Sequence, residues 1–257
     1  DQELYFLCPD KIGEEMEQEA IEKSIRLDLE RKEVRVGLPF VRDPITHLKG
    51  LHRGADSNFV QADRMFRANC RRIKDEKRRE SLVQTKNGLV ESGFMINIKD
   101  LPDNQRKIIE GAQFKHYMPW TVAEKPGSTS TPFRFAVDAS ITGLNEILAK
   151  GTNNLNKILD ILIRNWCKRY VWSSDITKLY YLLLLEDQAL PYGLFLFNDE
   201  LNPDIPPEIY VMLVAWYGVS STGNQANSAL LKLAEVLQDE FPLVREILEK
   251  DIFLDDA

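Results

Sequence analysis

Apolar residues recur at regular spacings along most of the chain and predict a mixture of helices and strands. A four-residue step of apolar positions with charges between them predicts an amphipathic helix over residues 14–33. Alternation over residues 34–40 predicts a strand after it. A second helix is predicted to begin after Asn58, a residue type that caps helices, and the charged run 74–80 is expected to continue it. That run is interpreted as a solvated helix face, with a phosphate-contacting patch as the alternative.

The rest of the chain alternates between strand-like and helix-like patterns. Strands are predicted over residues 93–98, 133–137, 170–176, 194–197, 209–214 and 252–254, and residues 117–123 are expected to be extended. Helices are predicted over residues 155–166, as a buried helix, and 224–237. The segments 124–131 and 198–208 are rich in turn-forming residues, so the second is expected to join a hairpin. Antiparallel strands with helices on one face indicate an α+β fold.

Composition narrows the class of protein without fixing it. The chain has 257 residues, 44% of them hydrophobic, which is enough for one large domain or two small ones. A net charge of -7 argues against a surface that is basic throughout, although a local basic groove remains compatible with it. Three widely separated cysteines and three histidines show neither a disulfide framework nor a zinc spacing, so a reducing compartment is expected. No apolar run is long enough to span a membrane.

Three carboxylates stand at the ends of apolar-rich runs. Asp175 closes the run 170–174, and the adjacent Asp255 and Asp256 follow the run 252–254. Strand ends that bring acids together can hold Mg²⁺, which prefers hard oxygen ligands, and two such ions can promote phosphoryl transfer. Side chains alternate along a strand, so Asp255, which continues the strand, is the better candidate of the pair. The alternative is that the pair is an acidic chain end with no ligand.

Six motifs follow one another in a fixed order. They are TPFRFAVDAS (131–140), LNEILAKG (144–151), ILIR (161–164), SDITKLY (174–180), YGVSSTGNQ (217–225) and FLDD (253–256). In order and spacing the chain resembles the reverse transcriptase region of BEL/Pao-type LTR retrotransposon polyproteins. The segments EAIEKSI (19–25) and LPFVRDP (38–44) are similar to the stretch before the polymerase there, so the likeness covers residues 14–257.

The resemblance implies a role for particular residues. Asp175, Asp255 and Asp256 would be the catalytic, metal-binding acids, serving two Mg²⁺ ions, with Mn²⁺ as a substitute. Tyr180 would be the aromatic gate against a 2′-hydroxyl. Arg134 would contact the incoming nucleotide, because a guanidinium can stack on a base and pair with phosphate. Gly218 would belong to the loop that supports the template–primer near the nucleotide, where Ser221, Thr222, Asn224 and Gln225 could donate hydrogen bonds to phosphate or base edges. For Tyr180, Arg134 and Gly218 the alternatives are a core aromatic, a surface arginine and a turn glycine. For Ser221, Thr222, Asn224 and Gln225 the alternative is capping of the next helix.

The resemblance also implies an organisation. It predicts polymerase right-hand fingers and palm, with an antiparallel palm sheet. Residues 1–55 would precede the polymerase, residues 56–130 would be fingers-like, and residues 131–257 would form the fingers and palm core. The chain starts at Asp1 and stops one residue after FLDD, so we expect a piece of a longer polyprotein that lacks the thumb, ribonuclease H and integrase. Weak metal binding and no processive synthesis are expected of this piece. In the motif FLDD, Phe and Leu stand before the two acids where the family more usually has Tyr and Val. Catalysis should tolerate this difference.

The function implied is RNA-directed DNA polymerisation in the cytoplasm or in retrotransposon particles. Its partners would be an RNA or DNA template–primer and deoxynucleotides, without a membrane. One alternative is a non-catalytic retroelement remnant that binds nucleic acid or protein, which the net acidity favours. Another is an unrelated cation-dependent nuclease built on the same three acids, although such an enzyme would not explain the order of the motifs.

Overall fold

A computed structural model describes residues 9–124, 133–153 and 156–253, and its contacts divide the chain into two compact units. Unit 1 consists of residues 1–41, 149–184 and 220–257, and unit 2 consists of residues 42–148 and 185–219. Each unit is therefore built from separated stretches of sequence. Each unit contains residues from more than one of the three segments predicted from the motifs, 1–55, 56–130 and 131–257. Those segments are continuous in sequence, whereas the two units are not.

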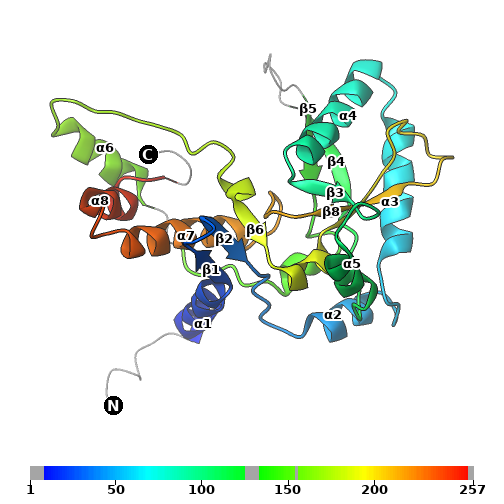
Figure 1. The fold of residues 1–257 in the computed structure, drawn as a ribbon, viewed down its shortest axis with the longest axis horizontal. Coiled ribbons are helices and arrows are strands. Elements are labelled where there is room, and N and C mark those ends of the chain that lie inside the picture. Colours follow the sequence, from blue (N-terminus) through cyan, green and yellow to red (C-terminus); the bar gives the residue numbers. More distant parts are fainter. Residues whose placement is uncertain (1–8, 125–132, 154–155, 254–257) are drawn as a thin grey trace. The chain divides into compact units, whose positions relative to one another are not determined.

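Unit 1 is organised around the helix α7 (Figure 1). Its elements are α1 (Pro9–Lys23), β1 (Ile25–Asp28), β2 (Glu33–Val36), α6 (Ile158–Trp166), the 3-10 helix η3 (Leu179–Leu182), β6 (Leu183–Leu185), α7 (Thr222–Val236) and α8 (Pro242–Lys250). The last residue of β6 is counted with unit 2. Helix α7 packs against α1, β1, η3 and α8. The strands form a sheet in the order β1-β2-β6, with β1 antiparallel to β2.

The predicted helix over residues 14–33 is wrong in its second half. Helix α1 ends at Lys23, and the N–H of Ser24 donates to the carbonyls of Ala20 and Ile21 at 3.1 and 3.0 Å. The Ser24 hydroxyl also donates to the Ile21 carbonyl at 2.6 Å, which closes the last turn. The chain then enters the β1–β2 hairpin, whose turn places Lys32 at a positive φ of 55°. The apolar positions spaced four residues apart, from which one helix was predicted, therefore belong to two elements: the end of α1 and the hairpin that follows it.

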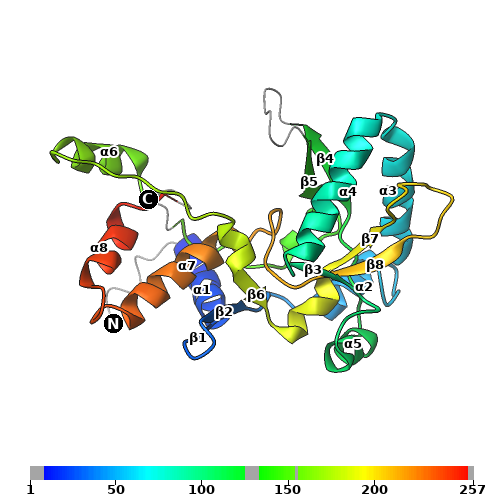
Figure 2. The same ribbon diagram turned by 45° about the horizontal axis from the view of Figure 1, so that its top comes forward.

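Unit 2 consists of small antiparallel sheets with helices packed on them (Figure 2). Its elements are α2 (Pro44–Leu51), α3 (Phe59–Arg72), α4 (Glu76–Glu91), β3 (Met95–Asn97), α5 (Asp103–Glu110), β4 (Trp120–Glu124), β5 (Phe133–Val137), η2 (Leu144–Glu146), η4 (Asp187–Tyr192), β7 (Leu194–Phe197) and β8 (Glu208–Met212). One sheet has the order β3-β8-β7, and the other pairs β4 with β5. Helix α3 contacts β4 and β7, whereas α4 contacts β3 and β5.

Aromatic side chains form the core of unit 2. The ring of Trp120 lies 5.3 Å from that of Phe197 and 6.2 Å from that of Phe66, and its Nε1–H donates to the Leu196 carbonyl at 2.8 Å. Phe195 and Trp216 pack edge to face at 6.4 Å. All four residues of β7 are buried, as expected of a strand covered on both faces. The predicted hairpin over residues 194–214 is confirmed.

Two helices stand where one continuous helix was predicted. Helix α3 begins after Asn58 as predicted, but the Asn58 side chain makes no cap and instead bonds both main-chain groups of Tyr117, at 2.6 and 2.8 Å. The charged run does not continue α3. Asp75 accepts a hydrogen bond from the Lys77 N–H at 2.9 Å, so it caps a new helix, α4.

The fold is α+β with antiparallel strands, as predicted, but the described strands lie in three separate sheets rather than one. The helix predicted over residues 155–166 forms as α6, yet it is not buried, because only Ile161 is. The predicted strand over residues 170–176 is wrong, since that stretch is irregular apart from a β-bridge at Asp175. Of the last predicted strand, Phe253 takes part in a bridge and Leu254 lies outside the described residues.

Candidate active site

Asp175 lies in an exposed position of unit 1, five residues before Tyr180. Its carboxylate forms no hydrogen bond or ion pair with the residues that the structure describes. After it the chain enters η3 through Lys178, whose φ of 59° turns the backbone sharply. An exposed carboxylate held by the backbone at the entry to a tight turn is accessible to a ligand from solvent.

Tyr180 reaches the first turn of α7. A Cβ built on Gly223 would lie 3.3 Å from the Tyr180 hydroxyl oxygen, and Tyr180 itself is half-buried. Because Gly223 carries no side chain, the phenol can approach the helix this closely. The motif at residues 174–180 therefore meets the motif at residues 217–225, although they are far apart in sequence.

Gln225 is buried and its amide is engaged within unit 1. Its Nε2–H₂ donates to the Ser24 hydroxyl at 2.8 Å and to the Gly37 carbonyl at 2.7 Å, while its Oε1 accepts from the Ser221 hydroxyl at 3.2 Å. These bonds tie the start of α7 to the ends of the β1–β2 hairpin. Binding of a template or nucleotide by this side chain stays a prediction.

Asn224 also binds protein groups rather than capping α7. Its Nδ2–H₂ donates to the Gln18 side chain at 3.0 Å, to the Thr152 carbonyl at 2.9 Å and to the Lys150 carbonyl at 3.1 Å. The N-cap residue of this helix, Ser221, makes no side-chain cap hydrogen bond. The polar residues of motif 217–225 thus hold α7 against α1 and the loop at residues 150–152.

Asp255 and Asp256 lie outside the described residues. The chain leading to them is anchored in unit 1, because Asn156 Nδ2 donates to the Ile252 carbonyl at 2.9 Å and Arg164 Nε pairs with Asp251 at 2.7 Å. Ile252 is buried, and Phe253 and Asp175 each take part in a β-bridge. Among the residues that the structure describes, no group of three potential metal ligands occurs.

The other two predicted site residues belong to unit 2. Arg134 lies in β5, and its side chain is not among those described. Gly218 has a φ of 100°, and its carbonyl accepts a hydrogen bond from Asn145 Nδ2 at 2.9 Å. Asn145 was not predicted as part of the site. Its only sequence signal is its place in the motif at residues 144–151.

A glycine is required at position 218 for two reasons. Its φ of 100° disfavours every other residue, and a Cβ there would lie 2.5 Å from the Val137 carbonyl oxygen. We therefore expect Gly218→Ala to lower the free energy of unfolding by about 2–3 kcal/mol. Urea denaturation followed by circular dichroism measures it.

Gly88→Ala is the matched control for this change. Gly88 lies inside α4 and a Cβ there would meet nothing within 4 Å, so the substitution should stabilise the protein by up to about 1 kcal/mol. Equal effects of the two substitutions would contradict the geometry described for Gly218.

None of the helices in the described part of the chain has the length and apolar character needed to cross a membrane. No family model matches the chain, and no curated protein matches it.

Proposed function

We propose that this chain is the fingers and palm part of an RNA-directed DNA polymerase that adds deoxynucleotides to a primer by two-metal nucleotidyl transfer. The order of its six motifs supports the proposal. The observation that carries it is the contact of Tyr180 with Gly223, which brings the first acid motif against the motif that begins α7.

The proposed reaction requires the protein to position the reactants and stabilise charge, without forming a covalent bond to the substrate. The primer 3′-hydroxyl loses its proton and attacks the α-phosphorus, a new P–O bond forms, and pyrophosphate leaves as the bond to the β-phosphate breaks. Magnesium would neutralise the charge that develops on the attacking and leaving oxygens. Asp175, Asp255 and Asp256 offer the carboxylate oxygens that suit this ion.

The other residues would position the substrate. The Tyr180 ring, packed beneath the sugar, would leave no room for a 2′-hydroxyl. The Arg134 guanidinium would pair with phosphate oxygens of the incoming nucleotide. Gly218 would let the backbone approach the template–primer, as an absent side chain permits.

A direct test measures metal binding without requiring activity. We expect the chain to bind Mn²⁺, detected as loss of the free-ion signal in electron paramagnetic resonance, and Asp175→Asn to weaken that binding by about 10-fold or more. The amide keeps the size of the side chain but removes its charge. Asp160→Asn is the matched control, because Asp160 is exposed on α6 and its side chain has no partner among the described residues.

The result also separates the two candidate functions. Binding that depends on Asp175 and not on Asp160 supports a polymerase site. Failure of the unaltered chain to bind Mn²⁺ at millimolar concentration would favour the non-catalytic remnant, with which the internal hydrogen bonds of Gln225 agree.

A further inference from the structure

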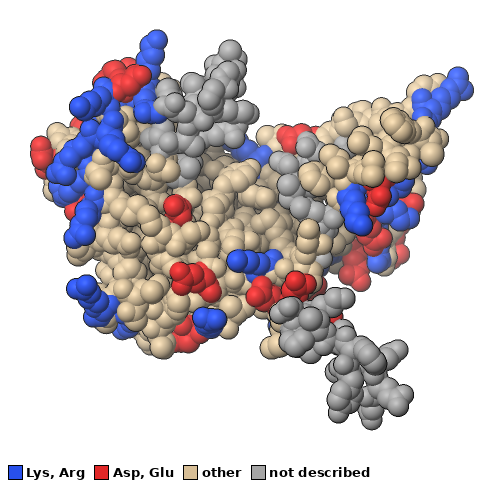
Figure 3. All heavy atoms as spheres, turned by 180° about the vertical axis from the view of Figure 1, so that it is seen from behind, with Lys and Arg blue, Asp and Glu red and all other residues tan. Residues whose placement is uncertain are grey.

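Positive charge is concentrated on one part of unit 2. Residues 64–79 carry eight Lys or Arg and two Asp or Glu, a net charge of +6, whereas the whole chain carries -7. The remainder therefore carries -13. Five of these cations are exposed, and we call them the α3–α4 basic ridge: Arg64, Arg71, Arg72, Lys74 and Lys77. Figure 3 shows Lys and Arg side chains gathered over this end of unit 2.

The helix α3 presents the ridge away from the core. Its buried residues are Ala62, Phe66, Asn69 and Cys70. At 100° per residue, Arg64 and Arg71 point to the opposite side, two turns apart, so their Cα atoms lie about 10 Å apart along the axis. Phosphates in one strand of a duplex advance about 3.4 Å each, so this separation matches about three nucleotide steps.

The ridge cations have few partners within the protein. The side chains of Arg64, Arg71, Lys74 and Lys77 form no hydrogen bond or ion pair with described residues, and the Arg72 side chain donates only to Asn69 Oδ1, at 3.2 Å. Their neighbour Arg67 differs, because it pairs with Asp63 at 2.8 Å and donates to the Pro203 carbonyl.

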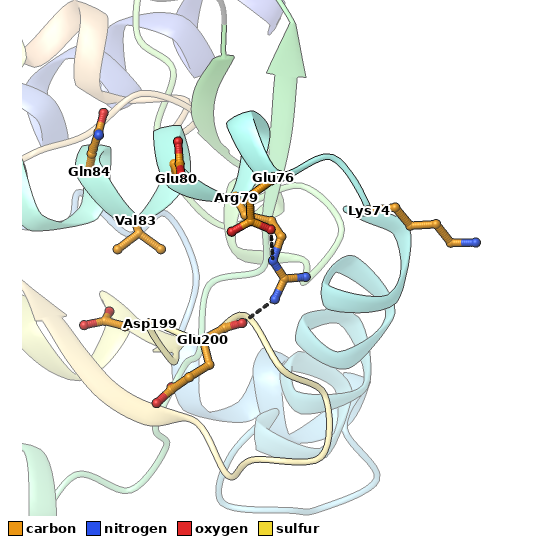
Figure 4. A pocket seen from close by; sticks show the side chains of 8 residues that line it. All are labelled: Lys74, Glu76, Arg79, Glu80, Val83, Gln84, Asp199 and Glu200. Carbon is orange, nitrogen blue, oxygen red and sulfur yellow. Dashed lines mark hydrogen bonds and ion pairs between the residues drawn. The ribbon is translucent and has the colours of Figure 1, made fainter.

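One acid, Asp75, lies within the ridge, where its carboxylate caps α4, and other acidic residues nearby belong to a neighbouring hollow. A cavity of about 520 Å³ is lined by Glu76, Glu80, Asp199 and Glu200 together with Arg79, which donates to the Glu200 carbonyl. Lys74 reaches the edge of this cavity, and Figure 4 shows its side chain pointing away from the acids. The five cations of the ridge therefore outnumber the one acid, Asp75, that lies among them.

The side chains around the ridge indicate what binds it. Phe59 and Val60 are exposed at the start of α3, but no large apolar side chain is exposed between residues 61 and 89, where the ridge lies. Single-stranded nucleic acid is held mainly by stacking on aromatic rings, and protein interfaces have an apolar or aromatic centre. A surface of spaced cations without either feature fits the outside of a double helix, where phosphates are the groups on display.

We propose that the α3–α4 basic ridge binds the sugar–phosphate backbone of a nucleic-acid duplex without reading its sequence. The proposal rests on charge and exposure in unit 2 and does not depend on the polymerase reaction. Its test is run in EDTA without nucleotides, so that duplex binding is measured in the absence of divalent metal. Failure of duplex binding can then be distinguished from failure of the metal binding that the polymerase proposal requires.

The experiment measures fluorescence anisotropy of labelled 20-nucleotide probes over a range of NaCl concentrations. The probes are an RNA–DNA hybrid, double-stranded DNA and single-stranded oligo(dT). We expect both duplexes to bind more tightly than the single strand. The plot of log affinity against log salt should have a slope of about -3 to -4 for the duplexes, since up to five phosphates are neutralised.

A triple variant tests the ridge itself. Arg71→Gln/Lys74→Gln/Lys77→Gln should weaken duplex binding at least about 10-fold and reduce the salt slope by about 2–3. The matched control, Lys107→Gln/Lys157→Gln/Lys168→Gln, changes the net charge equally at exposed positions outside the ridge and should leave both quantities nearly unchanged. Thermal melting checks that both variants fold.

Three outcomes would overturn the proposal. One is an equal loss of binding in the two triple variants, which would indicate a general charge effect. Another is equal affinity for the single strand. The third is competition by poly-glutamate as effective as competition by unlabelled duplex, which would assign the ridge to acidic proteins instead.

Discussion

Asp175→Asn is expected to lower template-directed nucleotide addition by more than about 100-fold. Loss of a group that merely orients a metal ligand already costs 10–100-fold, and Asp175 is proposed to be a ligand itself. The substitution removes one negative charge from the place where magnesium would neutralise the transferring phosphate. Addition of a single nucleotide to a fluorescent DNA primer on an RNA template, which does not require processive synthesis, measures the effect with Mg²⁺ and separately with Mn²⁺.

The design separates lost chemistry from lost folding. The Asp175 side chain is exposed and makes no hydrogen bond or ion pair with described residues, so its replacement should leave the melting temperature unchanged. Asp160→Asn should leave extension unchanged. Nucleotide addition that persists in Asp175→Asn at the level of the unaltered chain would rule out the proposed site.

The second large effect concerns His116 and the pH dependence of stability. His116 is completely buried, with one ring nitrogen 2.8 Å from the Thr142 hydroxyl and the other 3.1 Å from the Tyr192 carbonyl. Burial lowers the pKa of His116 from 6.5 to about 4, an effect opposed by the Tyr192 carbonyl and reinforced by His52. The native state therefore holds this ring neutral.

The sign of the effect follows from which state binds the proton. Between pH 6.5 and about 4 the unfolded chain protonates His116 whereas the folded chain does not. Stability contributed by the neutral ring is complete above pH 6.5 and is lost as the pH falls toward 4. The loss is about 1.4 kcal/mol per pH unit, or about 3 kcal/mol in total. Burial also lowers the pKa of His52, which acts in the same direction.

Urea denaturation at pH 7, 6 and 5 measures this dependence. Carboxylates also begin to titrate at the lower end of this range, so the informative quantity is the difference between the unaltered protein and His116→Gln. We expect the variant to be less stable at pH 7 and to lose less stability on acidification. Parallel pH profiles for the two proteins would contradict a neutral buried His116.

Elements with a strong period and clear boundaries were predicted well. The helix α3, the hairpin of β7 and β8, and the helix α7 occur close to their predicted places. Each has a regular apolar pattern between turn-forming residues, so local preference and burial agree. The prediction of α6 was correct for its conformation and wrong for its burial. A period identifies which residues share a face, but it does not show whether anything covers that face.

The other errors also arise because the structure of a segment depends on residues that are distant in sequence. The aromatic and apolar residues at 170–174 suit a strand, but a strand requires a neighbour to pair with, which local sequence does not reveal. The candidate site likewise has one feature that the sequence indicated and another that it did not. The proximity of Tyr180 to α7 agrees with the expectation that the motifs at residues 174–180 and 217–225 belong to one site. The hydrogen bonds of Gln225 to Ser24 and Gly37 join positions about 200 residues apart, so no local pattern indicated them.

The interleaving of the two units determines when each can form during protein synthesis. Unit 2 needs residues up to 219, and the described helices of unit 1 extend to residue 250. The first 41 residues therefore leave the ribosome long before α7, their packing partner, has been made. Most of the nascent chain must wait for contacts that are remote in sequence, and such topologies fold slowly and expose apolar surface to chaperones meanwhile.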